Sequence, residues 1–152
     1  MNLSKSFTLN ELTKSQEATR LGIDNTPNEE QIQNLKILCE KILQPLRDFY
    51  GMPVSVSSGY RSVALCEAIG SSSKSQHTKG EAADFEIFGV PNKEVAEFIV
   101  KNLTYDQCIL EFWNENEPNS GWVHCSYSVN SNRKQYLKAE KLNGRIVYTV
   151  LD

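Results

Sequence analysis

The stretch Ser75-Gln76-His77-Thr78-Lys79-Gly80-Glu81-Ala82-Ala83-Asp84, with the later Trp122-Val123-His124, decides the interpretation of this 152-residue chain. The two segments contain both histidines of the sequence. Two imidazoles and one carboxylate form a three-ligand set that leaves a fourth position of a zinc ion open for water, as in catalytic sites. We therefore expect His77, Asp84 and His124 to bind one Zn²⁺ per chain.

The surroundings of these residues support a buried site. Asp84 lies in the apolar run 82–87, where an ionised carboxylate is costly to bury unless it is paired or bound to a metal. His124 lies on an apolar, aromatic segment that is expected to be a strand. Gly80 suits a tight turn between the first histidine and the acid. The alternative readings are a hydrogen-bonded buried acid and a core histidine.

Composition predicts one domain over residues 1–152 and excludes several partners. The hydrophobic fraction of 39% is enough for a core, and the net charge of -3 offers no basic surface for nucleic acid. No apolar run is long enough to span a bilayer, so we expect no membrane insertion, and we expect a monomer. Residues 1–7 lack the apolar core of a signal peptide, which predicts synthesis in the cytoplasm. Four widely spaced cysteines are expected to be reduced and buried.

The order of predicted elements gives an α+β fold class, with helices first and strands later. Thr8 and Glu11 suggest a capping box, and Gly22 a helix stop. Thr26 and Glu29 suggest the start of a long helix that Pro45 kinks or shortens. Further helices are expected over 63–69 and after Pro91, and strands over 54–57, 82–87, 108–112 and 122–127, with a terminal hairpin at Asn143-Gly144.

Three motifs together resemble a known family. Ser58-Gly59-Tyr60-Arg61-Ser62, the Ser75-x-His77-x-x-Gly80-x-Ala82-x-Asp84 pattern and Trp122-Val123-His124 are similar to those of the zinc D-alanyl-D-alanine carboxypeptidases, which share the hedgehog/D-Ala-D-Ala peptidase zinc fold. The family includes vancomycin-resistance dipeptidases and bacteriophage cell-wall endopeptidases. The runs at 7–12, 22–27 and 43–47 resemble the short, single-domain phage and prophage members, and the resemblance extends over about residues 7 to 127.

The resemblance implies a small antiparallel sheet with helices mainly on one face and one zinc site on the sheet. It further implies hydrolysis of peptide bonds in the peptidoglycan stem: the D-Ala-D-Ala bond, the L-Ala-D-Glu bond or a cross-link, among which the sequence does not choose. For a phage-derived enzyme without a signal peptide, release by a holin or delivery in a virion would bring it to the cell wall.

The sequence departs from the family pattern at the position expected for the general base. Many relatives have an acid three residues before the last histidine, but here that position is Gly121. We predict that Glu111 replaces it, because Glu111 ends an apolar strand expected beside that of His124, where burial would raise its pKa. Glu115 and Glu117, in the loop before Gly121, are the alternatives.

Other residues are assigned to the substrate. Arg61, in the Ser-Gly-Tyr-Arg segment, is expected to bind the substrate carboxylate or carbonyl oxygen and to stabilise the oxyanion. Ser75 and Gln76 could bind substrate or hold the ligand loop, and Trp122 and Tyr127 could line the cleft.

Two rival hypotheses follow from the same residues. A thiolate at Cys125, next to His124, could act as a nucleophile, but adjacent strand residues point to opposite faces. Alternatively, the chain could be a catalytically inactive zinc-containing module that binds the cell wall or builds a virion.

Overall fold

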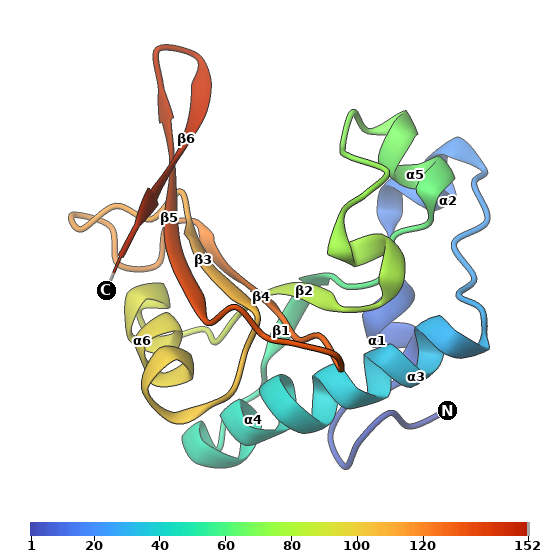
Figure 1. The fold of residues 1–152 in the computed structure, drawn as a ribbon, viewed down its shortest axis with the longest axis horizontal. Helices are drawn as coiled ribbons and strands as arrows, with labels where there is room; N and C mark the ends of the chain where they lie inside the picture. The colour runs from blue at the N-terminus through green and yellow to red at the C-terminus, as the bar shows by residue number, and fades with distance from the viewer. Residues whose placement is uncertain (152) are drawn as a thin grey trace.

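A single six-stranded sheet organises residues 1–151, the part of the chain that the computed structural model describes (Figure 1). The strand order is β1-β2-β4-β3-β5-β6. The strands are β1 (Ser55–Ser58), β2 (Ala82–Glu86), β3 (Gln107–Glu111), β4 (Trp122–Ser126), β5 (Gln135–Leu142) and β6 (Arg145–Val150). The helices are α1 (Leu9–Thr13), α2 (Gln16–Leu21), α3 (Glu29–Leu38), the π-helix η1 (Cys39–Leu43), α4 (Gln44–Tyr50), α5 (Val63–Ala68), the 3₁₀ helix η2 (Gln76–Lys79) and α6 (Asn92–Asn102). The α+β class is confirmed.

The sheet is mixed, whereas the resemblance implied an antiparallel one. Neighbouring strands pair antiparallel except for β3 and β5, which are parallel. The chain leaves β4 at the end of the sheet where β3 begins, passes over that end and enters β5 in the direction of β3. Asp106, just before β3, marks the crossing: its N–H donates to Ser126 O, and its carbonyl accepts from the Gln135 N–H.

Helices cover one face of the sheet, as expected. In Figure 1, α4 and α6 lie on the same side of the sheet, and Phe49 of α4 stacks on Phe98 of α6 with ring centroids 4.3 Å apart. The core forms between this helical layer and alternate residues of the central strands: Ala83 and Phe85, Cys108 and Leu110, and Val123 and Cys125. The intervening residues of the same strands therefore face the other side, which is free for a site.

The helix that precedes the site begins later than predicted. Thr26 is not its N-cap, and the backbone N–H of Thr26 donates to the Asp24 carboxylate at 3.0 Å. Asn28 is the N-cap, and it exchanges hydrogen bonds with Gln31 in a capping box. Glu29 is thus the first residue of α3 rather than a capping partner. The predicted Thr8–Glu11 capping box is confirmed.

Pro45 neither breaks nor ends the long helix. A proline removes one backbone donor and collides with the preceding turn of a regular helix. The chain widens into the π-helix η1 just before it, where the N–H of Gln44 bonds to Cys39 O, five residues back. The helical path then continues as α4 to Gly51.

The C-terminal hairpin is confirmed. Asn143 and Gly144 both have positive φ, at 52° and 78°, as a tight two-residue turn requires. In Figure 1 this hairpin extends away from the helical layer. Within residues 1–151 no helix combines the length and apolar character needed to cross a bilayer.

Candidate metal centre and active site

The register of the sheet places two of the three predicted ligands side by side on its open face. Asp84 of β2 pairs with His124 of β4, which in turn pairs with Ile109 of β3. Because successive residues of a strand alternate between faces, these three side chains lie in one row on the face opposite the helices.

The third ligand comes from the 3₁₀ helix η2. Ser75 caps this turn by accepting a hydrogen bond from the His77 N–H at 3.2 Å. His77 Nδ1 lies 2.7 Å from the carbonyl oxygen of Gly59, which can only accept, so Nδ1 carries the proton. Nε2 is the ring nitrogen that faces the site, and it lies 3.5 Å from Asp84 Oδ1. Such a second hydrogen bond fixes the tautomer that a metal needs.

Helix α3 holds the turn in place. Gln31 Nε2 donates to Thr78 O at 3.0 Å, and Asn34 Nδ2 donates to Lys79 O at 2.9 Å. Gly80, with φ of 74°, ends the turn against the same helix, and a Cβ there would collide with the Gln31 carbonyl. Only glycine satisfies both the backbone angle and the close approach.

Asp84 is the centre of the arrangement. Its Oδ1 lies 2.8 Å from His124 Nδ1, and its Oδ2 lies 3.3 Å from an Arg61 guanidinium nitrogen. Burial alone would raise the pKa of Asp84, but the hydrogen bonds from His124 and His77 outweigh it and hold that pKa well below its usual range. The carboxylate is therefore ionised at neutral pH.

The donor set fits a zinc ion. The three ligand atoms lie within 4.8 Å of one another, with His77 and Asp84 buried and His124 half-buried. Zinc bonds of about 2.0–2.1 Å at tetrahedral angles would separate ligand atoms by about 3.3 Å. The 3.5 Å between His77 and Asp84 agrees with this, whereas the 2.8 Å between His124 and Asp84 is a hydrogen-bond length.

A cavity of about 340 Å³ opens onto these three residues. Of the residues predicted for catalysis and substrate binding, it is lined by Arg61, Ser75, Gln76, Glu111 and Trp122. Tyr127 does not line it: the residue follows β4 and packs against the helix-side core, because it has the strand parity of Cys125 rather than of His124. Neither Glu115 nor Glu117 lines the cavity, and both are exposed in the loop before β4.

Glu111 is the carboxylate of this cavity outside the ligand set. It pairs with Trp122 across the β3–β4 ladder, two residues along β3 from Ile109, and so faces the same side as His124. Burial, and then the negative charge of Asp84, raise the pKa of Glu111 above its ordinary value, while His124 and Arg61 act in the opposite direction.

Gly121 has a structural reason to be glycine. Its φ is 65°, and a Cβ at this position would overlap the backbone carbonyls of Glu111 and Phe112. The close contact brings the start of β4 against the end of β3, where Glu111 sits. The position at which relatives carry an acid therefore has no room for a side chain, and the adjacent strand presents a carboxylate instead.

Arg61 is held from two sides. Its Nε donates to Ser58 Oγ at 2.8 Å, and its backbone N–H donates to His77 O at 3.1 Å. Together with the contact to Asp84, these bonds fix the guanidinium at the edge of the cavity. The predicted position of Arg61 just beyond a strand end is confirmed.

A network behind the ligand turn is not apparent from the sequence. Gln76 Nε2 donates to Asp106 Oδ2 at 2.9 Å, and Arg133 donates to both Asp106 oxygens from its side chain at 3.0 Å and to Oδ1 from its backbone N–H at 2.7 Å. Gln76 thus combines a place in the cavity wall with a structural role next to His77. The partners are separated by 27 to 57 residues along the chain, so no local motif reveals them.

Replacing Asp106 by asparagine is expected to lower the free energy of unfolding by about 2–3 kcal/mol, because an amide cannot accept all of these bonds. Burial alone would raise the pKa of Asp106, but the Arg133 hydrogen bonds lower it. The carboxylate therefore stabilises the fold above its ordinary pKa of 3.8, and this contribution is lost as pH falls through the lowered value. Denaturant unfolding of both proteins at pH 7 and pH 3 measures the effect. A difference of equal size at both pH values would contradict it.

Tyr148 is a second residue that the sequence did not single out. It pairs with Ala139 on β5, which in turn pairs with Glu111, and it lines the cavity from β6. The signal was available in principle, since the hairpin register that begins at Asn143-Gly144 places alternate β6 residues on the open face.

Cys125 points away from the site. Its thiol is fully buried in the helix-side core beside Cys108, which pairs with it across β3 and β4. Burial raises the pKa of the Cys125 thiol well above its ordinary value. A thiolate nucleophile at this position, activated by His124, is therefore excluded by geometry and by protonation.

The fold and the site together define a zinc-dependent peptidase. Residues 5–126 match the family model described as Peptidase M15, and the chain belongs to that family. The family agrees with the resemblance noted in the motifs and supports a zinc peptidase that acts on peptidoglycan. The matched range contains the ligand triad, Arg61 and Glu111, whereas Arg133 and Tyr148 lie beyond it. A comparison with curated proteins gave no match.

Proposed function

We propose that this chain hydrolyses a peptide bond of the peptidoglycan stem, as a carboxypeptidase or an endopeptidase. His77, Asp84 and His124 would hold the zinc ion, with Glu111 as general base and Arg61 as anchor for the substrate. The observation that carries the proposal is the convergence of two imidazole nitrogens and a buried carboxylate on a cavity that Glu111 also lines.

When bound to these residues, Zn²⁺ lowers the pKa of a coordinated water and polarises a carbonyl group. Glu111 would accept the proton of the attacking water and return it to the leaving amine. Burial raises the pKa of Glu111, which makes this carboxylate a better proton acceptor than an exposed one.

Arg61 and Trp122 would position the substrate. When Asp84 binds the metal, the guanidinium of Arg61 can direct its donors to a carboxylate or to the developing oxyanion. The indole ring of Trp122 lines the cavity and would pack against the substrate.

The proposed setting follows the resemblance of the runs at 7–12 and 22–27 to phage and prophage members. The chain would act as a monomeric cell-wall lysis enzyme that reaches the wall through a holin or within a virion. The second candidate is an inactive zinc module for wall binding or virion structure. Gly121 in place of the acid favours the inactive module, whereas the half-buried Glu111 carboxylate in the metal cavity favours the enzyme.

Zinc analysis combined with hydrolysis tests the proposal. We expect about one zinc per purified chain, and release of peptide fragments or D-alanine from isolated peptidoglycan. A chelator should abolish the release, and added zinc should restore it. Mass spectrometry of the fragments identifies the bond. Zinc binding without cleavage of several wall types would favour the inactive module, and a chain without zinc would contradict the assignment of the ligands.

A further inference from the structure

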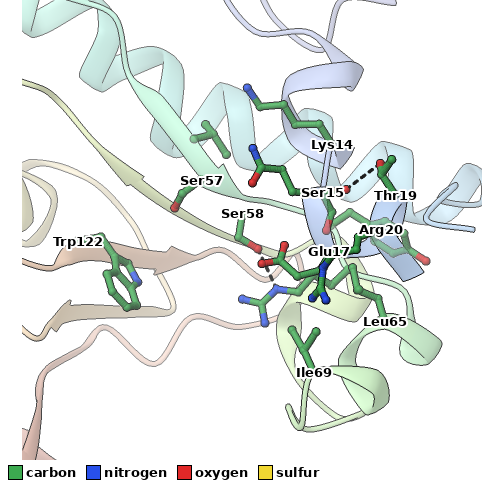
Figure 2. A pocket seen from close by; sticks show the side chains of 14 residues that line it. Lys14, Ser15, Glu17, Thr19, Arg20, Ser57, Ser58, Leu65, Ile69 and Trp122 are labelled. Atoms are coloured by element: carbon green, nitrogen blue, oxygen red, sulfur yellow. Dashed lines mark hydrogen bonds between the residues drawn. The ribbon is translucent and has the colours of Figure 1, made fainter. Parts of the chain in front are cut away.

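A second and larger cavity adjoins the metal cavity. It has a volume of about 1040 Å³ and lies between the α1–α2 segment, strand β1 and helix α5 (Figure 2). Arg61 and Trp122 line both cavities, so the two cavities meet at these residues. In Figure 2, Trp122 lies across the opening from the α2 side chains, with Ser57 and Ser58 of β1 between them. We call this second cavity the α2 groove.

The α2 groove is cationic. Lys14, Arg20 and Arg61 line it, against a single acid, Glu17. This local excess of positive charge occurs in a chain whose net charge is -3. Within residues 1–151, neither Lys14 nor Arg20 has an ion-pair partner, in contrast to Arg61, which contacts Asp84.

Hydrogen bonds hold other residues that line the groove in place. Ser58 accepts the hydrogen bond that orients Arg61 at the junction. Ser15 caps α2 by accepting from the Ala18 N–H at 3.2 Å, and Thr19 Oγ1 donates back to Ser15 O at 3.1 Å. Arg20 thus projects from a short helix whose start is fixed by its own side chains, and Lys14 lies in the link just before that helix.

We propose that the α2 groove binds the part of the stem peptide that lies away from the scissile bond, and that Lys14 and Arg20 pair with a free carboxylate there. The proposal rests on the proposed function, because the groove meets the metal cavity at Arg61 and Trp122, so an extended peptide bound at the metal site would reach it. The stem supplies such a group in the α-carboxylate of its γ-linked D-glutamate. Arg61 remains available for the reacting end.

The positive charge of the groove favours a carboxylate of the stem peptide over the uncharged glycan of the cell wall. An uncharged stretch of glycan gains nothing from two cations, whereas a carboxylate gains a charge-assisted contact. Exposed ion pairs are individually weak and screened by salt, so the expected effect is one of selectivity rather than of catalysis.

Two synthetic peptides test the proposal. One is L-Ala-γ-D-Glu-L-Lys-D-Ala-D-Ala, and the other carries an amide in place of the D-glutamate α-carboxylate. We expect the zinc-loaded protein to cleave the first with a kcat/KM about three- to tenfold higher at low salt. The Lys14→Gln/Arg20→Gln variant should lose this preference while it cleaves the amidated peptide as before. The Lys101→Gln/Arg145→Gln variant, with the same change in net charge at distant exposed sites, should retain it.

A preference that persists in the Lys14→Gln/Arg20→Gln variant, or an equal loss for both peptides, would overturn the proposal. If the zinc-loaded protein cleaves neither peptide, the catalytic proposal fails for these substrates, and calorimetric titration of the same peptides then decides on the groove. A lower Kd for the carboxylate peptide that disappears only in this variant supports the groove. Equal Kd values, or no binding, overturn it.

Discussion

Replacing Asp84 by asparagine is expected to remove zinc from the purified protein and to lower kcat/KM for peptidoglycan fragments by about a thousandfold or more. The amide preserves the shape of the side chain but not the negative charge that two imidazoles and Zn²⁺ require. The loss of a direct ligand should exceed the 10- to 100-fold effects that are typical of residues around the ligands. Metal analysis after dialysis and steady-state kinetics measure both effects.

The Asp106→Asn variant provides the matched control. It also removes one buried carboxylate, and its hydrogen-bond partner Gln76 adjoins His77, but Asp106 is no member of the ligand triad. It should keep its zinc while it loses stability. If the Asp84→Asn protein retains stoichiometric zinc and normal hydrolysis, the assignment of the metal site is wrong.

Glu111→Gln is expected to lower kcat by about 10² to 10⁴-fold while zinc stays bound, because the cavity would lack a group that can take up a proton. The pH profile should change with it. Glu111 must be ionised to act as base, so wild-type kcat/KM should fall as pH falls through the pKa of Glu111, which burial raises above the ordinary value of 4.5. The residual activity of the variant should lack this acidic limb.

The same raised pKa predicts the effect on stability. At neutral pH the ionised Glu111 is less favourable in the folded chain than in the unfolded one, so the Glu111→Gln protein should unfold at an equal or higher temperature. The Glu115→Gln/Glu117→Gln variant, altered in the exposed loop, should keep its activity. Full activity in Glu111→Gln, or loss of activity only in the loop variant, would transfer the role of base to the loop.

The metal ligands and the local capping and turn motifs could be predicted from the sequence. The chain has only two histidines, and their spacing from Asp84 follows the family pattern, so the ligand set could be named before the fold was known. The Asn143-Gly144 turn and the Thr8–Glu11 capping box are local as well, and the structure confirms both.

Features that depend on contacts between distant segments could not be predicted from the sequence. The parallel β3–β5 pair arises from a crossing that no local signal encodes. The sequence predicts a helix start at Thr26, whereas the structure has Asn28 as the N-cap of α3 in a capping box with Gln31. Tyr127 is predicted to line the cleft, but its position along the strand, two residues after Cys125, places it on the core side. The Asp106–Arg133 contact and the α2 groove exist only once the segments have assembled.

The glycine at position 121 has a consequence for how genomes are read. A search that requires an acid three residues before the last histidine would classify this chain as a degenerate, inactive member. Under the proposal that Glu111 is the base, the neighbouring strand supplies the carboxylate, and the backbone leaves no room for a side chain at position 121. An acid cannot be introduced at position 121 by one substitution alone, because its side chain would collide with the main chain at Glu111. Members that carry glycine there should be sorted by the residue at the end of the adjacent strand before they are counted as enzymes or as remnants.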